Sequence, residues 1–74
     1  MLKNPMNIQD QFLSRVRRDR TRLTIELTTG RKVEGVIVSY DNFSVLLRGE
    51  SDQLFYKHAI VSISTGQRLD LETA

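Results

Sequence analysis

The apolar residues of this chain change their spacing once, near Thr21, and that change constrains the fold more than any other feature. Before it, four apolar residues recur at the spacing of one helical face: Ile8, Phe12, Leu13 and Val16. After it, apolar and polar residues alternate, as they do in half-buried β-strands. The sequence therefore predicts one amphipathic helix followed only by short strands, which is a mainly β fold.

Local signals set the expected bounds of these elements. We expect the helix over about residues 8–19, with Asn7 as its N-cap and Asp10 three residues later. Strands are expected over about residues 22–28, 31–41, 43–48, 53–58 and 60–64. Thr29-Gly30 predicts a tight turn between the first two strands. Gly35, inside the second strand, predicts a strong bend or a bulge.

One helix and five short strands suit a small, strongly bent antiparallel sheet, an open barrel, better than a sandwich. Residues 7–65 would form this domain, residues 1–6 a flexible N-terminal arm, and residues 66–74 a short polar C-terminal tail. The fourth and fifth strands lack proline and other edge protection. Pairing these two edges between identical subunits would close a ring.

Composition narrows the classes of function. The chain has 74 residues, no cysteine and one histidine, so disulfides and thiolate metal sites are excluded, and we expect neither a metal nor a cofactor. No apolar run approaches the length of a membrane span, and residues 1–9 lack the apolar core of a secretory signal. We therefore expect a cytoplasmic protein with no membrane contact. A net charge of +2 is compatible with a nucleic-acid partner but does not establish one.

The stretch YKHAI, residues 56–60, places Lys57 beside His58 at the expected end of the fourth strand. For an isolated pair, a solvated lysine and a structural histidine are the better interpretation. Repeated around a ring, the pair would concentrate hydrogen-bond donors that suit phosphate, ribose hydroxyls and uracil carbonyls.

The stretch DNF contains Phe43 after two turn-forming residues, so a partly exposed ring is expected there. Such a ring gives a base a stacking surface worth about 1–3 kcal/mol, whereas the alternative is a core phenylalanine after a turn. Asp41 is expected to be a turn and hydrogen-bonding residue. The arginines of RVRRDR are usually a solvated helix face, but arginine also binds phosphate.

From Asn7 to about Ile63 the chain resembles the Hfq family, bacterial RNA chaperones of the Sm/LSm superfamily. The resemblance rests on NIQDQFL, on GVIVSYDNF and above all on YKHAI. It implies an Sm-like fold and a homohexameric ring that joins the fourth and fifth strands of neighbouring subunits. It also implies binding of single-stranded RNA, with uridine-rich 3′ ends at a proximal pore, and annealing of small regulatory RNAs to mRNAs.

The resemblance also implies roles for individual residues. A proximal set would bind RNA at the pore: Gln9, Asn42, Phe43, Lys57 and His58. A rim set would promote annealing: Arg17, Arg18, Arg20 and Arg48. A distal set would bind RNA on the other face: Gly30, Arg31, Lys32, Val33, Gln53 and Ser62. Tyr56 is expected at the subunit boundary.

The distal face departs from the family pattern at Glu26 and Glu34. Glu26 stands where the family has an aromatic residue, so it cannot stack on adenine, and both carboxylates repel phosphate. Arg31 could stack in place of the ring and could pair with Glu26 across the strands. We therefore expect weakened or altered binding of adenine-rich RNA.

Other classes of function remain open at this point. A protein-interaction scaffold of the Sm-like type, with reduced RNA binding, is the alternative that Glu26 and Glu34 favour. An enzyme is not expected, because Ser39, Ser44 and Asp41 occur without a G-x-S-x-G turn or a P-loop. Weak, non-specific DNA binding fits the arginines, and RNA-processing proteins are further candidate partners.

Overall fold

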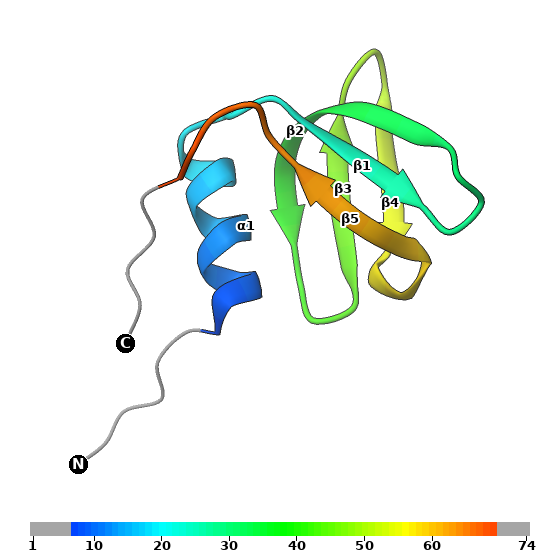
Figure 1. Cartoon of the computed structure of the whole chain (residues 1–74), viewed down its shortest axis with the longest axis horizontal. Coiled ribbons are helices and arrows are strands. Elements are labelled where there is room, and N and C mark those ends of the chain that lie inside the picture. Colours follow the sequence, from blue (N-terminus) through cyan, green and yellow to red (C-terminus); the bar gives the residue numbers. More distant parts are fainter. Residues whose placement is uncertain (1–6, 70–74) are drawn as a thin grey trace.

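The computed structural model describes residues 7–69 and shows helix α1 (Ile8–Arg18) packed beside a five-stranded antiparallel sheet (Figure 1). The predicted N-cap is confirmed, because the Asn7 side chain accepts a hydrogen bond from the Asp10 N–H at 2.8 Å. Leu13 and Val16 are buried, as expected. Ile8 is not, since 61% of it is exposed, so the apolar face of the helix is shorter than predicted.

The helix ends one residue before the predicted boundary, and its last carbonyls are satisfied by the two residues after the cap. The Thr21 N–H donates to the Val16 carbonyl at 3.0 Å, and the Arg20 N–H donates to the Arg17 carbonyl at 3.3 Å. These two hydrogen bonds form a Schellman motif, in which the residue directly after the C-cap takes a left-handed backbone conformation. Arg20 takes that conformation with φ 53°, at a position where glycine is the common residue.

The strands are β1 (Leu23–Leu27), β2 (Lys32–Tyr40), β3 (Ser44–Arg48), β4 (Asp52–Tyr56) and β5 (Ile60–Ser64). Their order across the sheet is β4-β3-β2-β1-β5, and every neighbouring pair is antiparallel. The fourth and fifth strands are therefore the two edges, as the sequence predicted. The predicted turn is also present: Gly30 has φ 91°, and its N–H donates to the Leu27 carbonyl at 2.8 Å.

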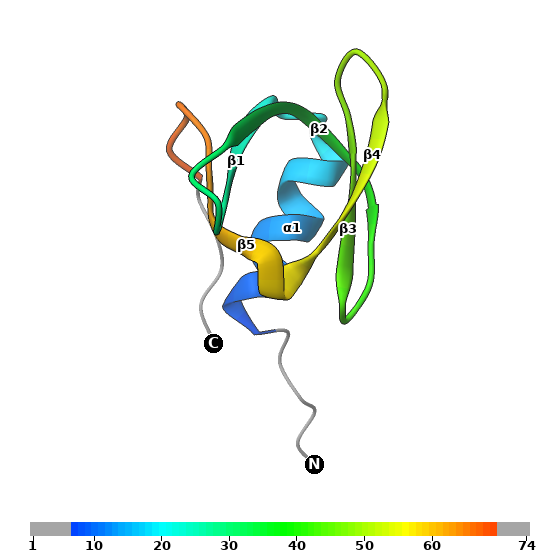
Figure 2. The ribbon, with the colours of Figure 1, turned by 90° about the vertical axis from the view of Figure 1, so that its right-hand side faces the viewer.

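The sheet is strongly bent along β2, which pairs with β1 at its start and with β3 toward its end (Figure 2). Gly35 permits the bend, because a Cβ at this position would lie 2.5 Å from the Arg48 carbonyl oxygen. A register shift between Ile37 and Ser39 adds to the curvature. The strong bend, one of the two outcomes predicted from the interior glycine, is thus confirmed, and the register shift lies a few residues after Gly35.

The core lies between the helix and the concave side of the sheet (Figure 2). It consists of seven buried apolar residues: Leu13, Val16, Leu23, Ile25, Ile37, Val45 and Leu47. Leu69 packs against it, so the part of the predicted C-terminal tail that the structure describes includes one core contact. The predicted N-terminal arm and residues 70–74 lie outside the described residues.

The predicted fourth strand is wrong at its end. β4 stops at Tyr56, and Lys57–Ala59 form a turn of 3-10 helix, η1, closed by the Ile60 N–H on the Lys57 carbonyl. The chain must turn here because it passes from one edge of the sheet to the other. An alternating pattern cannot reveal such a corner, so the sequence extended the strand through Lys57 and His58.

Candidate nucleic-acid interface

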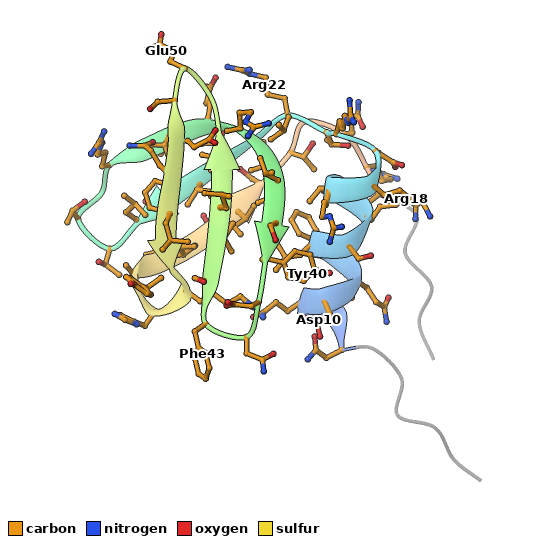
Figure 3. The ribbon with its side chains drawn as sticks, turned by 180° about the vertical axis from the view of Figure 1, so that it is seen from behind. Asp10, Arg18, Arg22, Tyr40, Phe43 and Glu50 are labelled. Atoms are coloured by element: carbon orange, nitrogen blue, oxygen red, sulfur yellow. The ribbon has the colours of Figure 1, made fainter. Side chains whose placement is uncertain are left out.

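The loop between β2 and β3 presents the most exposed aromatic side chain in the described part of the structure. Phe43 is 76% exposed and points away from the sheet at the tip of this loop (Figure 3). The Asp41 Oδ1 atom orders the loop by accepting three hydrogen bonds: from the Phe43 N–H at 2.9 Å, the Ser44 N–H at 2.8 Å and the Ser44 hydroxyl at 2.9 Å. The expected exposed ring and the expected turn residue are both confirmed.

The electrostatics of this loop follow from those bonds. The pKa of Asp41 is lowered from its ordinary value, first by the Phe43 N–H, then by the hydroxyl and N–H of Ser44, with a further contribution from the charge of Lys57. The carboxylate is therefore ionised throughout the physiological pH range. It serves as a fixed acceptor inside its own loop.

The η1 turn lies directly against this loop. The Lys57 N–H donates to the Phe43 carbonyl at 2.7 Å, and the Lys57 Nζ atom lies 5.9 Å from the centroid of the Tyr40 ring. The latter distance is within the range of a cation–π contact. His58 is exposed, and its ring stacks on Tyr56 with 6.0 Å between centroids and 12° between planes. Two segments far apart in sequence thus form one surface.

The helix contributes to the same region. A groove of about 200 Å³ runs beside η1 and β5 and is lined by Gln9, Leu13, Val45, Lys57, Ile60, Val61, Ser62 and Ile63. The structure therefore brings Gln9 together with Lys57 in one groove. It brings Asn42 and Phe43 to η1 through the loop contact, and it leaves His58 open to solvent.

The four rim arginines differ in how their charges are compensated. Arg18 pairs with Asp19 at 3.2 Å, and Arg48 pairs with Asp52 through two bonds of 2.7 and 3.0 Å. The hydrogen bonds that Arg48 donates to the Asp52 carboxylate raise the pKa of Arg48. Arg17 and Arg20 form no ion pair within residues 7–69. Their charges are the ones most available to a polyanion.

Three rim arginines share one depression of the surface. A groove of about 360 Å³ is lined by Arg17, Arg20, Val36, Ile37, Val38 and Arg48. Its lining combines three arginines with three apolar residues. Arginine can bind phosphate there through its guanidinium group and also pack over apolar atoms.

The distal set is only partly assembled within one chain. Gly30 and Arg31 lie in the β1–β2 turn. Glu26 on β1 has Lys32 as its cross-strand neighbour on β2 and Ser62 as its neighbour on β5, so these three side chains lie in a row across the sheet. Val33 is half-buried against the core. Gln53 lies on β4, at the other edge of the sheet, so one chain does not bring it to the rest.

The suggested ion pair between Glu26 and Arg31 is not formed in the described residues. Arg31 belongs to the turn, and the cross-strand neighbour of Glu26 is Lys32. Glu34 instead pairs with Arg22 at 3.5 Å, an exposed contact that sequence reasoning missed. The charge that Glu34 brings to this face is therefore partly compensated, whereas that of Glu26 has no ion pair among residues 7–69.

Sequence reasoning also missed how Tyr40 and Ser44 support the loop. Tyr40 packs against the core and lies under the Lys57 ammonium group, and Ser44 supplies two of the three donors to Asp41. An aspartate followed three residues later by a serine was the available signal, because an aspartate side chain commonly accepts a hydrogen bond from a backbone N–H a few residues later.

No helix in residues 7–69 is long and apolar enough to cross a membrane.

Comparisons with known proteins point to one family. The Hfq protein family model matches residues 8–70. An RNA-binding protein Hfq of Geobacillus sp. is 44% identical over 73 residues, covering 97% of this chain and 99% of its own. Another of the same name, from Sinorhizobium fredii, is 49% identical over 72 residues, covering 96% of this chain and 90% of its own.

Solved structures agree with the sequences. A crystal structure of the pleiotropic translational regulator Hfq superposes with a TM-score of 0.78 at 35% identity, covering 80% of this chain and all of the other. An Hfq protein from Anabaena sp. superposes with a TM-score of 0.73 at 19% identity, over 77% of this chain and 93% of its own, and supports the fold alone. The helix, the bent five-stranded sheet and these matches together establish that the chain belongs to the Hfq family.

Proposed function

We propose that this chain is an RNA chaperone that binds uridine-rich 3′ ends of single-stranded RNA and promotes annealing of small regulatory RNAs to mRNAs in the cytoplasm. One observation carries the proposal: the exposed Phe43 ring and Lys57 occupy a single surface, joined by the 2.7 Å bond between their segments. Recognition of single-stranded RNA relies on such combinations of an aromatic face and hydrogen-bond donors.

Assembly into a homohexameric ring is part of this proposal. The edge strands β4 and β5 carry exposed apolar side chains: Leu54 at 54%, Tyr56 at 55% and Val61 at 60%. Pairing β4 of one subunit with β5 of the next would cover these side chains and pair the free N–H and C=O groups of both edge strands. A ring would bring six copies of Lys57 and His58 around one axis, and it would bring Gln53 of one subunit toward the distal set of its neighbour.

The rim set supplies the annealing activity in this proposal. Two polyanions must approach one another, so a cationic surface has to screen their repulsion. The groove lined by Arg17, Arg20 and Arg48 offers such a surface. Arg17 and Arg20 should contribute more than Arg18 and Arg48, whose charges are paired with Asp19 and Asp52.

The distal face is proposed to bind adenine-rich RNA weakly. Glu26 lies between Lys32 and Ser62, carries an unpaired charge within residues 7–69 and has no ring to stack on a base. The same feature favours a second candidate, a protein-interaction scaffold with reduced RNA binding. The contacts between Phe43 and η1 favour the chaperone.

Fluorescence anisotropy with a labelled uridine hexamer bearing a free 3′ hydroxyl tests the proposal, with an adenine-rich 18-mer run in parallel. Salt concentration must be fixed because phosphate contacts make affinity salt-dependent. We expect tight uridine binding that Phe43→Ala and His58→Ala both weaken, and weaker adenine binding. No uridine binding by an assembled ring would reject the chaperone and leave the scaffold as the better candidate.

A further inference from the structure

We propose that Asp41 is a positioning residue for base recognition, because its carboxylate holds the Phe43 ring in the orientation that stacks on RNA. This inference rests on the proposed function, since it concerns the same surface. Asp41 need not contact the RNA. It acts by fixing the backbone from which the ring projects.

The geometry shows why the loop needs this support. The Phe43 ring is 76% exposed, so core packing does not define its direction. Its backbone is instead held by a few polar contacts: the Asp41 Oδ1 atom accepts from the Phe43 and Ser44 N–H groups and from the Ser44 hydroxyl, and the Asp41 N–H donates to the Ser44 carbonyl at 2.9 Å. A free ring at a loop tip would lose conformational entropy on binding a base, and a fixed ring loses less.

The loop that this carboxylate orders also contacts the lysine of the candidate site. The Phe43 carbonyl accepts from the Lys57 N–H at 2.7 Å, and the charge of Lys57 acts on Asp41. The ordered loop therefore sets the position of Phe43 relative to Lys57. A base stacked on the ring would meet the η1 donors in one defined register, which is the requirement for selecting uracil.

The acceptor geometry, more than the negative charge, should matter. A carboxylate close to RNA phosphates opposes binding by repulsion, so charge alone would weaken affinity. Asp41→Asn keeps an oxygen acceptor and removes the charge, whereas Asp41→Ala removes both. Ser44→Ala removes one donor of the three and leaves the two backbone donors in place.

The test is anisotropy with the labelled uridine hexamer on Asp41→Ala, Asp41→Asn and Ser44→Ala, each in the wild-type and the Phe43→Ala backgrounds. Asp41→Ala should weaken binding at least about fivefold, within the range attributed to a lost base–aromatic stack. Asp41→Asn should stay within about twofold of the wild type, the usual error of additivity. In the Phe43→Ala background, Asp41→Ala should add less than about twofold, because the ring that it positions is absent.

Two results would overturn the inference. An undiminished effect of Asp41→Ala in the Phe43→Ala background would show that Asp41 acts elsewhere, and normal binding by Asp41→Ala would show that the ring needs no support. If Asp41→Ala fails to fold by circular dichroism, Ser44→Ala decides instead: a loss that disappears with Phe43→Ala supports the inference, and no loss rejects it. Failure of the proposed function itself is distinguishable, because then the wild type would not bind uridine or Phe43→Ala would have no effect.

Discussion

Gly35 offers the sharpest test of how the backbone bend holds this fold together. A Cβ there would lie 2.5 Å from the Arg48 carbonyl oxygen and 2.8 Å from its carbonyl carbon, about 0.9 Å inside the 3.4 Å at which ordinary contacts begin. Both neighbouring atoms are backbone, so no side chain can rotate away. In Gly35→Ala, the paired strands β2 and β3 must therefore separate locally, at the point where the sheet turns.

The expected cost follows from that overlap. Overpacking a tightly packed site typically costs about 1–3 kcal/mol, and a backbone clash belongs at the upper end of that range. Each kcal/mol lowers the Tm of a domain of this size by about 4–8 °C, so Gly35→Ala should melt about 10–20 °C below the wild type. Thermal unfolding by far-UV circular dichroism, at one protein concentration because assembly raises apparent stability, measures the change.

Gly66→Ala is the matched control, because a Cβ at Gly66 meets nothing within 4 Å. It should melt within about 4 °C of the wild type, as surface substitutions usually change stability by no more than about 0.5 kcal/mol. If Gly35→Ala melts together with Gly66→Ala, the close approach of β2 and β3 is not a constraint on the fold. The explanation of the bend given above would then be incorrect.

Three further predictions concern the helix ends and the loop. Asn7→Ala removes the N-cap acceptor and should cost about 1 kcal/mol, seen as a lower Tm. Arg20→Gly should raise the Tm by a few degrees, because the left-handed backbone of Arg20 costs about 1–2 kcal/mol with a side chain and glycine removes that strain. The same substitution should slow annealing of two complementary labelled RNAs, because it removes a rim charge. A lower Tm would show that the Arg20 backbone is not strained. The pKa of Asp41 is lower in the folded chain than its ordinary 3.8, so its stabilising effect is present above that value and is lost as pH falls through the folded pKa. The Tm difference between the wild type and Asp41→Asn should accordingly be constant from pH 8 to pH 5, begin to shrink near pH 3.8 and be lost as the pH falls through the lower pKa of the folded chain; a difference that changes between pH 8 and pH 5 would point to another group.

Much of the fold could be predicted because its signals are local. Asn7 lies next to the helix that it caps, and Gly30 lies inside the turn that it permits. The alternation of apolar and polar residues from Leu23 to Leu27 indicates the half-buried strand that these residues form. These signals depend on backbone conformation and on neighbours within a few residues, which the sequence displays directly.

The residues of the candidate site were proposed from the sequence as a set, but their arrangement in space was not. The motifs and the family resemblance singled out Phe43, Lys57 and His58, and the exposure of Phe43 agrees. The 3-10 turn of η1 was missed, because a corner between two sheet edges leaves no periodic signal. The ion pairs were missed as well: Arg22 with Glu34 depends on which side chains the register of β1 and β2 brings together.

The sequence by itself determined one helix, five strands, a bend at Gly35, two unprotected edges and an exposed ring at Phe43, since each of these follows from residue type and short-range spacing. Only the tertiary structure decided that the Lys57 N–H meets the Phe43 carbonyl and that Gln9 shares a groove with Lys57. It also decided that Val33 packs against the core and that Gln53 lies apart from the rest of the distal set. The physical reason is distance along the chain. Such contacts exist only after the bent sheet has closed around its core, and their identities depend on register and curvature that no local pattern encodes.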